Sequence, residues 1–191
     1  MGFTLTPYLS EQPVRMFSGA APATEPGRDY AAVLETDAGR LVLDLTEAET
    51  PTTVNSFVFL ARNRYFDGIA FHRVLDGFVA QAGDPNTLQD NRARWGTGGP
   101  GYGFGLEVVP SLRFDARGVL GMARSSSPNS NGSQFFITLA PTQSLNGMYT
   151  VFGRVLEGDA VLDRIARNAG PMTPPATPTR LTRVYIVERA R

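Results

Sequence analysis

The chain has 191 residues and 18 basic against 18 acidic side chains, so no overall charge attracts nucleic acid or an anionic membrane surface. It has no cysteine and one histidine, His72, which excludes disulfides, thiol nucleophiles, Cys-based zinc sites and sites built from several histidines. The content of 42% hydrophobic and 19% charged residues is that of a globular protein with one domain, with or without an extension.

Residues 1–28 contain four prolines and no sustained periodicity, which predicts an N-terminal extension. Its apolar side chains, among them Phe3, Tyr8 and Phe17, favour partial packing on the surface of a domain formed by residues 29–191. The chain lacks an apolar run of about 18 residues, and its N-terminus lacks the pattern of a signal peptide. We therefore expect a cytoplasmic protein with no membrane partner.

The first predicted elements are a β hairpin and a helix. Residues 30–45 alternate around the turn at residues 37–40, a pattern typical of two antiparallel strands. Thr50 can then cap a helix, and Pro51 fits its first turn, where a missing N–H costs nothing. Apolar side chains follow at helical spacing: Val54, Phe57, Val58 and Ala61. We expect this helix to end at about Arg62.

The stretch from residue 69 to residue 84 places polar side chains inside an apolar β pattern. The Asp76-Gly77 pair separates two runs of β-forming residues and predicts a hairpin, because glycine adopts positive φ without steric cost. Arg73 and Gln81 lie within the strands, where an unpaired buried polar group costs roughly 1–3 kcal/mol. The two side chains are therefore predicted to face either water or a functional cleft.

Two loops contain patterns that could indicate function. Gly96, Gly98 and Gly101 form a GxGxxG pattern, but a dinucleotide fingerprint needs a helix beginning within it. Pro100 and further glycines follow instead. The three serines of the loop at residues 124–133 have neither a second histidine nor a GxSxG elbow to activate a nucleophile. Both loops are predicted to be structural or solvated.

The rest of the chain predicts four strands and a second helix. The strands cover residues 118–122, 134–139, 149–156 and 181–187. The helix begins at Asp159 and ends at Gly170 as its C-terminal cap. Its predicted buried side chains are Val161, Leu162, Ile165, Ala166 and Ala169. About eight short strands without βαβ alternation predict a mainly β fold, a barrel or a sandwich whose ends are covered by helices.

Five motifs resemble those of the cyclophilins, the cyclosporin-type peptidyl-prolyl isomerases, and occur in that family's order. They cover residues 66–84, 96–102, 118–123, 131–137 and 149–153. Only the first 28 residues lie outside the resemblance. It implies a closed eight-stranded antiparallel β-barrel capped by two α-helices, with the active face on the outside of the barrel. It also implies a peptidyl-prolyl cis-trans isomerase without cofactor, metal or covalent intermediate.

The resemblance assigns roles to residues of the central hairpin. The barrier to rotation about a peptide bond is about 18–20 kcal/mol, because the nitrogen lone pair is delocalised into the carbonyl. A guanidinium that donates to the prolyl nitrogen favours the twisted amide and so binds the transition state better than either ground state. The resemblance implies this role for Arg73, with Phe78 and Gln81 as the other catalytic residues. Gln81 would position Arg73 or the substrate carbonyl.

The resemblance also implies which residues bind the substrate. The lining of the proline pocket would be Phe78, Val79, Met122, Phe136 and Leu145. The residues before proline would lie against Gln134 and the backbone of Ala123, Arg124 and Ser125. Tyr149 would contribute an aromatic face and a polar tip, at a position where many members have His. His72 would be a hydrogen-bonded structural residue in the barrel wall, since adjacent strand positions face opposite sides.

The register of the central hairpin sets a condition on this site. A two-residue turn at Asp76-Gly77 would pair Arg73 with Ala80 and place Gln81 on the opposite face. For Gln81 to join the site, a bulge or a wider loop must shift the register by one residue. We therefore predict an irregularity at residues 75–79.

Two departures from the family pattern bear on ligands. Ser144 falls where the best-known members have a tryptophan that contacts cyclosporin, so we expect weak cyclosporin binding. The segment at residues 124–128 is one residue longer than in the shorter family pattern. This leaves open whether Arg124 or Ser125 makes the backbone contact to substrate.

Three functions compete. The first is a monomeric isomerase that acts on Xaa–Pro bonds in unfolded or flexible protein chains and assists folding. The second is a proline-peptide binding module with little catalysis, and the third is a carbohydrate-binding β-sandwich. The presence of Arg73, Phe78, Gln81, Gln134 and Phe136 favours the enzyme.

Overall fold

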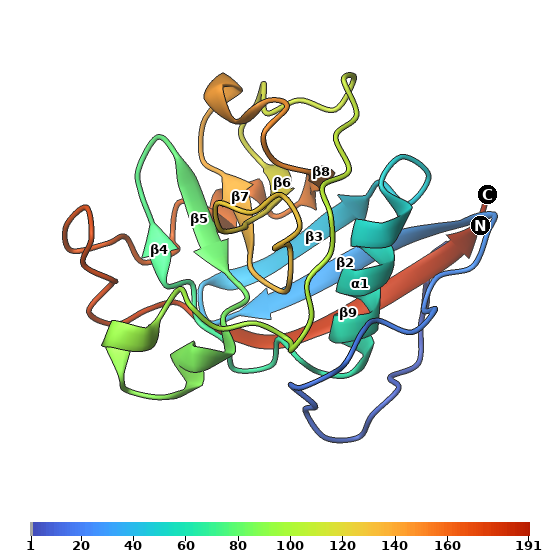
Figure 1. Cartoon of the computed structure of the whole chain (residues 1–191), viewed down its shortest axis with the longest axis horizontal. Coiled ribbons are helices and arrows are strands. Elements are labelled where there is room, and N and C mark those ends of the chain that lie inside the picture. Colours follow the sequence, from blue (N-terminus) through green and yellow to red (C-terminus); the bar gives the residue numbers. More distant parts are fainter. Residues whose placement is uncertain (1) are drawn as a thin grey trace.

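The computed structural model describes residues 2–191, which form one antiparallel sheet and one α-helix (Figure 1). The helix is α1 (Pro51–Arg62). The strands are β1 (Thr4–Leu5), β2 (Arg28–Thr36), β3 (Gly39–Leu45), β4 (Arg73–Val74), β5 (Val79–Ala82), β6 (Val119–Met122), β7 (Phe135–Thr138), β8 (Val151–Glu157) and β9 (Leu181–Ala190). Their order in the sheet is β1-β9-β2-β3-β8-β6-β7-β5-β4, which confirms the mainly β prediction.

Backbone hydrogen bonds join the β4 end of this strand order to β9, the strand next to the other end. The segment before β4 pairs with the start of β9: Phe71 N–H donates to Thr179 O at 2.9 Å, and Leu181 N–H donates to Ile69 O at 2.8 Å. Ala70 and Arg180 form an antiparallel bridge between these bonds. The ladder therefore continues from the β4 side to the β9 side, as closure of the sheet into a barrel requires.

The first hairpin and the first helix form as predicted, apart from the helix cap. Thr50 occupies the N-cap position, but its hydroxyl contacts Thr46 instead of the helix. The carboxylate of Glu107 accepts hydrogen bonds from the N–H groups of Thr52 and Thr53, at 3.0 and 2.7 Å. A carboxylate at this end of a helix also interacts favourably with the helix dipole. α1 packs on β9 (Figure 1). Its apolar side chains, among them Val54, Phe57 and Val58, belong to the largest buried apolar cluster, which we call the main core.

The prediction of a second α-helix, from Asp159 to Gly170, is wrong. Residues after Asp159 form one short 3-10 turn, η4 (Asp159–Val161), and then irregular backbone. The reason is tertiary: Asn168 pairs with Val74 of β4, accepting its N–H at 2.8 Å and donating its own N–H back at 2.9 Å. Gly170 caps no helix and bridges Thr173. Val161, Leu162 and Ile165 are nevertheless buried, as predicted. Ala166 is only half-buried and Ala169 is exposed, so the prediction of burial was wrong for these two.

The N-terminal residues lie against the domain before β2 begins. β1 pairs with β9, and the N–H groups of Leu9 and Val14 donate to carbonyls at the C-terminal end of α1, at 2.7 and 3.1 Å. The ring of Phe17 meets that of Phe59 edge to face, with 4.8 Å between centroids. Among residues 2–191, no helix has the length and apolar character needed to cross a membrane.

Candidate active site

A three-residue loop sets the register of the central hairpin. Leu75 N–H donates to Val79 O, Phe78 N–H donates to Leu75 O, and Gly77 has φ +67°. Arg73 therefore lies opposite Gln81, and Val74 opposite Ala80. This confirms the predicted irregularity, because a two-residue turn would have paired Arg73 with Ala80.

This register aligns the site across four strands. Arg73 on β4 is opposite Gln81 on β5, Gln81 is opposite Phe136 on β7, and Phe136 is opposite Gly121 on β6. Directly opposed residues of an antiparallel sheet point to the same face. We call this side of β4, β5, β7 and β6 the active face. Its opposite side carries Ala80, Phe135 and Ile137, which belong to the main core.

A second apolar cluster lies on the active face. Its buried members are Val79, Phe114, Val119, Phe136 and Val151, and Phe78, Ala123, Leu145 and Tyr149 pack against it. The Phe136 ring meets Phe114 at 5.5 Å and the edge of Tyr149 at 5.9 Å. These contacts hold Phe136 in place from two sides. Phe136 is therefore a rigid apolar floor.

The cluster surrounds a pocket of about 210 Å³, which we call the small pocket. Its lining is Arg73, Phe78, Val79, Gln81, Ala123, Arg124, Phe136, Leu145 and Tyr149. The guanidinium of Arg73 lies over the Phe78 ring, 5.6 Å from its centroid. Within residues 2–191 this guanidinium has no hydrogen bond to a side chain or carbonyl and no ion pair. Its donors are thus available to a molecule in the pocket.

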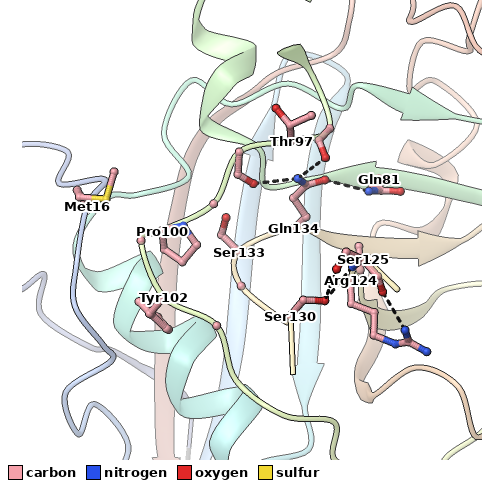
Figure 2. A pocket seen from close by; sticks show the side chains of 17 residues that line it. Met16, Gln81, Thr97, Pro100, Tyr102, Arg124, Ser125, Ser130, Ser133 and Gln134 are labelled. Atoms are coloured by element: carbon pink, nitrogen blue, oxygen red, sulfur yellow. Dashed lines mark hydrogen bonds between the residues drawn. The ribbon is translucent and has the colours of Figure 1, made fainter. Parts of the chain in front are cut away.

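Gln81 and Gln134 connect the small pocket to a larger one. Gln81 Nε2 donates to Gln134 Oε1 at 3.0 Å, and Gln134 Nε2 donates to the carbonyls of Gly96 and Gly98 at 3.0 and 2.9 Å. Figure 2 shows these bonds. Gln81 is next to Arg73 in the ladder, but its amide is bonded to Gln134. The glycine-rich loop therefore fixes Gln134, and Gln134 fixes Gln81.

The larger pocket, about 790 Å³, is called the large cavity below (Figure 2). Its lining includes Gln134, Ser125, Ser130 and the glycine-rich loop at residues 96–103. Gln81, Ala123 and Arg124 line both pockets, so the two are neighbours. Ser125 and Gln134, predicted to bind substrate, line the large cavity and not the small pocket.

Arg124 connects two loops at the edge of the small pocket. Its Nε and Nη2 donate to Met148 O at 3.0 and 2.8 Å, and its Nη1 donates to Ser125 O at 2.9 Å. The guanidinium also lies over the Tyr149 ring, 4.9 Å from the centroid. Ser125 N–H donates to Ser130 Oγ at 3.0 Å. In the described part of the chain, the N–H and C=O of Arg124 itself have no partner.

Met122 does not line the small pocket. It is opposite Phe135 in the ladder, and both side chains lie in the main core. Alternation along β6 is the cause, since Gly121 occupies the active face and its neighbour must face inward.

Two residues of the site, Gly121 and Phe114, were not predicted from the sequence. A Cβ on Gly121 would overlap the Phe136 ring, so only glycine lets that ring approach β6 this closely. Phe114 is fully buried beneath Phe136, and its backbone N–H donates to Asn146 Oδ1 at 2.7 Å. The GVLG pattern could have indicated a close approach at Gly121. Phe114 lies in an irregular segment without periodicity, and nothing in its sequence context indicated its role.

His72 is buried, as predicted, but among residues 2–191 its ring nitrogens make no hydrogen bond of ordinary length and angle, although the Ala70 backbone and the Gln134 side chain lie near them. The residue is 5% exposed. Burial lowers the pKa of His72 below its ordinary value and outweighs the opposite effect of Asp84. The imidazole is therefore favoured in its neutral form. In the same part of the chain, no group of three or more His, Cys, Asp or Glu side chains is arranged to hold a metal ion.

Comparisons with known proteins agree with this geometry. The family described as cyclophilin type peptidyl-prolyl cis-trans isomerase/CLD matches residues 31–186. Peptidyl-prolyl cis-trans isomerase-like 1 of Gibberella zeae is 39% identical over 157 residues, 82% of this chain and 94% of the relative. A peptidyl-prolyl cis-trans isomerase of Arabidopsis thaliana is 41% identical, over 82% of this chain and 95% of the relative.

Solved structures are also similar to this chain, and they include cyclophilin-type isomerases. A cyclophilin-type peptidyl-prolyl cis-trans isomerase of Cryptosporidium parvum, solved in the presence of the dipeptide Ala-Pro, matches with a TM-score of 0.74 and 31% identity. The match covers 82% of this chain and 98% of that structure. The family match covers most of the chain and includes every strand of the active face. The chain therefore belongs to the family of cyclophilin-type peptidyl-prolyl cis-trans isomerases.

Proposed function

We propose that this protein accelerates rotation about Xaa–Pro bonds by donating a hydrogen bond from Arg73 to the prolyl nitrogen. The observation that carries the proposal is an unpaired guanidinium on the wall of a pocket of about 210 Å³ with an apolar floor. A proline ring on Phe136 would present its nitrogen toward this wall. In the planar amide the nitrogen lone pair is delocalised and accepts poorly, so the bond strengthens as the amide twists.

The free backbone of Arg124 is the contact for the residues that precede proline. Ser125 N–H is already bonded to Ser130, and Ser125 C=O accepts from the Arg124 side chain. The N–H and C=O of Arg124 are the pair still available to an extended peptide beside the small pocket. A peptide bonded there continues past Gln81 into the large cavity. The free backbone groups therefore favour Arg124 over Ser125 as the residue that makes the backbone contact to substrate, a choice that the sequence left open.

The substrates we propose are exposed Xaa–Pro segments of unfolded or flexible protein chains. The small pocket lies on the outer face of the sheet, and all of its lining comes from one chain, so a monomer suffices. We also propose weak cyclosporin binding, because the exposed Ser144 of η3 (Gln143–Leu145) offers no ring surface beside Leu145. A Ser144→Trp variant should bind cyclosporin more tightly than wild type, and equal affinities would contradict this assignment.

An isomerisation assay on a proline-containing tetrapeptide tests the function. Wild type should accelerate cis–trans exchange, and Arg73→Ala should lower kcat/KM by about 100- to 1000-fold, the range for loss of a preorganised donor. Arg73→Lys is the matched control: it keeps the charge but not the planar fork, and should recover little. The alternative, a proline-peptide binding module, predicts tight peptide binding with a wild-type rate no higher than that of Arg73→Ala.

A further inference from the structure

Met16 is an exposed methionine at the mouth of the large cavity. It belongs to the N-terminal segment, outside the residues matched by the family. The residue is 73% exposed, so burying its side chain contributes little to stability. Figure 2 shows Met16 next to Pro100, on the side of the cavity away from Gln81.

The backbone around Met16 is held on both sides. Arg15 Nη2 donates to Asp67 O at 2.6 Å, and Phe17 N–H donates to Pro100 O at 2.8 Å. Phe17 also packs edge to face on Phe59 of α1. The segment is thus fixed to the glycine-rich loop, and the exposed thioether projects from an ordered position.

Gly101 allows this close approach. A Cβ at Gly101 would lie 2.5 Å from both the Met16 sulfur and the Phe17 carbonyl oxygen, and Gly101 also has φ +96°. Any other residue there would push the N-terminal segment away from the cavity. Met16 is therefore in direct contact with the loop that forms one wall of the large cavity.

In the proposed binding mode, the residues that precede proline continue from the small pocket into the large cavity. It shares Gln81, Ala123 and Arg124 with the small pocket. An extended chain advances about 3.3 Å per residue, so residues shortly before proline reach this cavity. Its lining consists largely of glycine backbone and small polar side chains, which leave room for a large side chain.

We propose that Met16 is a specificity-determining residue, which contacts an aromatic side chain of the substrate from one of the three positions before proline. This inference rests on the proposed function of the small pocket. A thioether is flexible and polarisable and makes favourable contacts with aromatic rings. Gly98, Gly99, Pro100 and Gly101 carry no long side chain, so this part of the cavity wall leaves room for a ring, with Met16 beside it.

Peptide affinities test the inference. Fluorescence anisotropy would measure Kd for labelled hexapeptides that carry Ala or Phe at each of the three positions before proline. Wild type should bind one Phe peptide more tightly than its Ala counterpart, and Met16→Ala should reduce this gain by about two- to tenfold. Met16→Leu should keep most of it. Met172→Ala, which changes another exposed methionine (91% exposed), should match wild type.

Two results would overturn the inference. One is a Phe-to-Ala affinity ratio that is unchanged in Met16→Ala, and the other is a wild type that gains from Phe at none of the three positions. Isomerisation rates measured on the same peptides distinguish a failure of the Met16 inference from a failure of the proposed function. A wild type that shows the Met16-dependent preference without accelerating isomerisation contradicts only the function, and a wild type that binds none of the peptides contradicts both.

Discussion

His72 is a buried imidazole with two unpaired nitrogens, one strand position away from Arg73. Because burial lowers its pKa, the unfolded chain takes up a proton near the ordinary value of about 6.5 while the folded protein does not. Below that pH the unfolded state binds more protons, so folding stability falls as pH falls, until the folded pKa is reached.

This predicts a pH-dependent difference between wild type and His72→Phe. Between pH 7.5 and 5.5 the free energy of unfolding of wild type should fall relative to the variant, by at most about 1.4 kcal/mol, which is the limit for one group with an unfolded pKa of about 6.5. Buried carboxyl groups such as Asp67, whose pKa is raised by burial, titrate in both proteins and cancel in the difference. Urea unfolding at several pH values measures it. If the free energies of unfolding of wild type and His72→Phe changed in parallel with pH, His72 would not titrate in this way.

Gly121 supports the floor of the small pocket. In Gly121→Ala the added methyl group would displace the Phe136 ring, and overpacking of this kind costs roughly 1–3 kcal/mol. We expect a lower Tm and a lower kcat/KM, since the ring is displaced from β6. Gly19→Ala is the control, because a Cβ there meets no atom within 4 Å. An active Gly121→Ala enzyme with unchanged Tm would show that the ring has room to move.

At the scale of elements, the hairpins and α1 could be predicted because their signals are local. The Asp76-Gly77 pair indicated the turn, and the need to place Gln81 beside Arg73 indicated the irregular register. The second helix could not be predicted correctly, because the side-chain oxygen and the backbone N–H of Asn168 both pair with the backbone of Val74, 94 residues earlier. A tertiary partner of this kind overrides helix propensity and leaves no sign in the local sequence.

The Asn168–Val74 pairing can be tested directly. Asn168→Ala removes the oxygen that accepts the N–H of Val74, and an unpaired N–H at this part-buried position should cost about 1–3 kcal/mol in the free energy of unfolding. Asn168→Asp keeps an oxygen acceptor and should lose less. Denaturant unfolding measures both variants. Equal stability of wild type and Asn168→Ala would mean that the bond contributes nothing to the fold.

At the scale of the whole molecule, the N-terminal segment joins β9, α1 and the glycine-rich loop. Removing residues 1–22 should therefore lower Tm by roughly 5–15 °C, as expected for a loss of a few kcal/mol from a chain of this size. Activity on an all-Ala proline peptide should persist, because the small pocket takes no residue from this segment. An unchanged Tm would identify the segment as a dispensable tail.

Most of the candidate site could be predicted from motifs, and the exceptions have physical causes. Arg73, Gln81 and Phe136 share one face because the strand register aligns them. Met122 was misplaced because alternation turns it inward. The bonding of Gln81 to Gln134 depends on the loop at residues 96–98, whose approach to β7 no local pattern indicates.

In the proposed mechanism, Arg73 stabilises the twisted amide and contributes little to substrate binding. NMR exchange spectroscopy on a saturating Xaa–Pro peptide would measure the cis–trans rate on the protein, alongside Kd from titration. Arg73→Ala should lower the exchange rate at least 100-fold and change Kd by less than about tenfold, because the bond strengthens only in the transition state. An Arg73→Ala enzyme that exchanges the bound peptide as fast as wild type would contradict this mechanism.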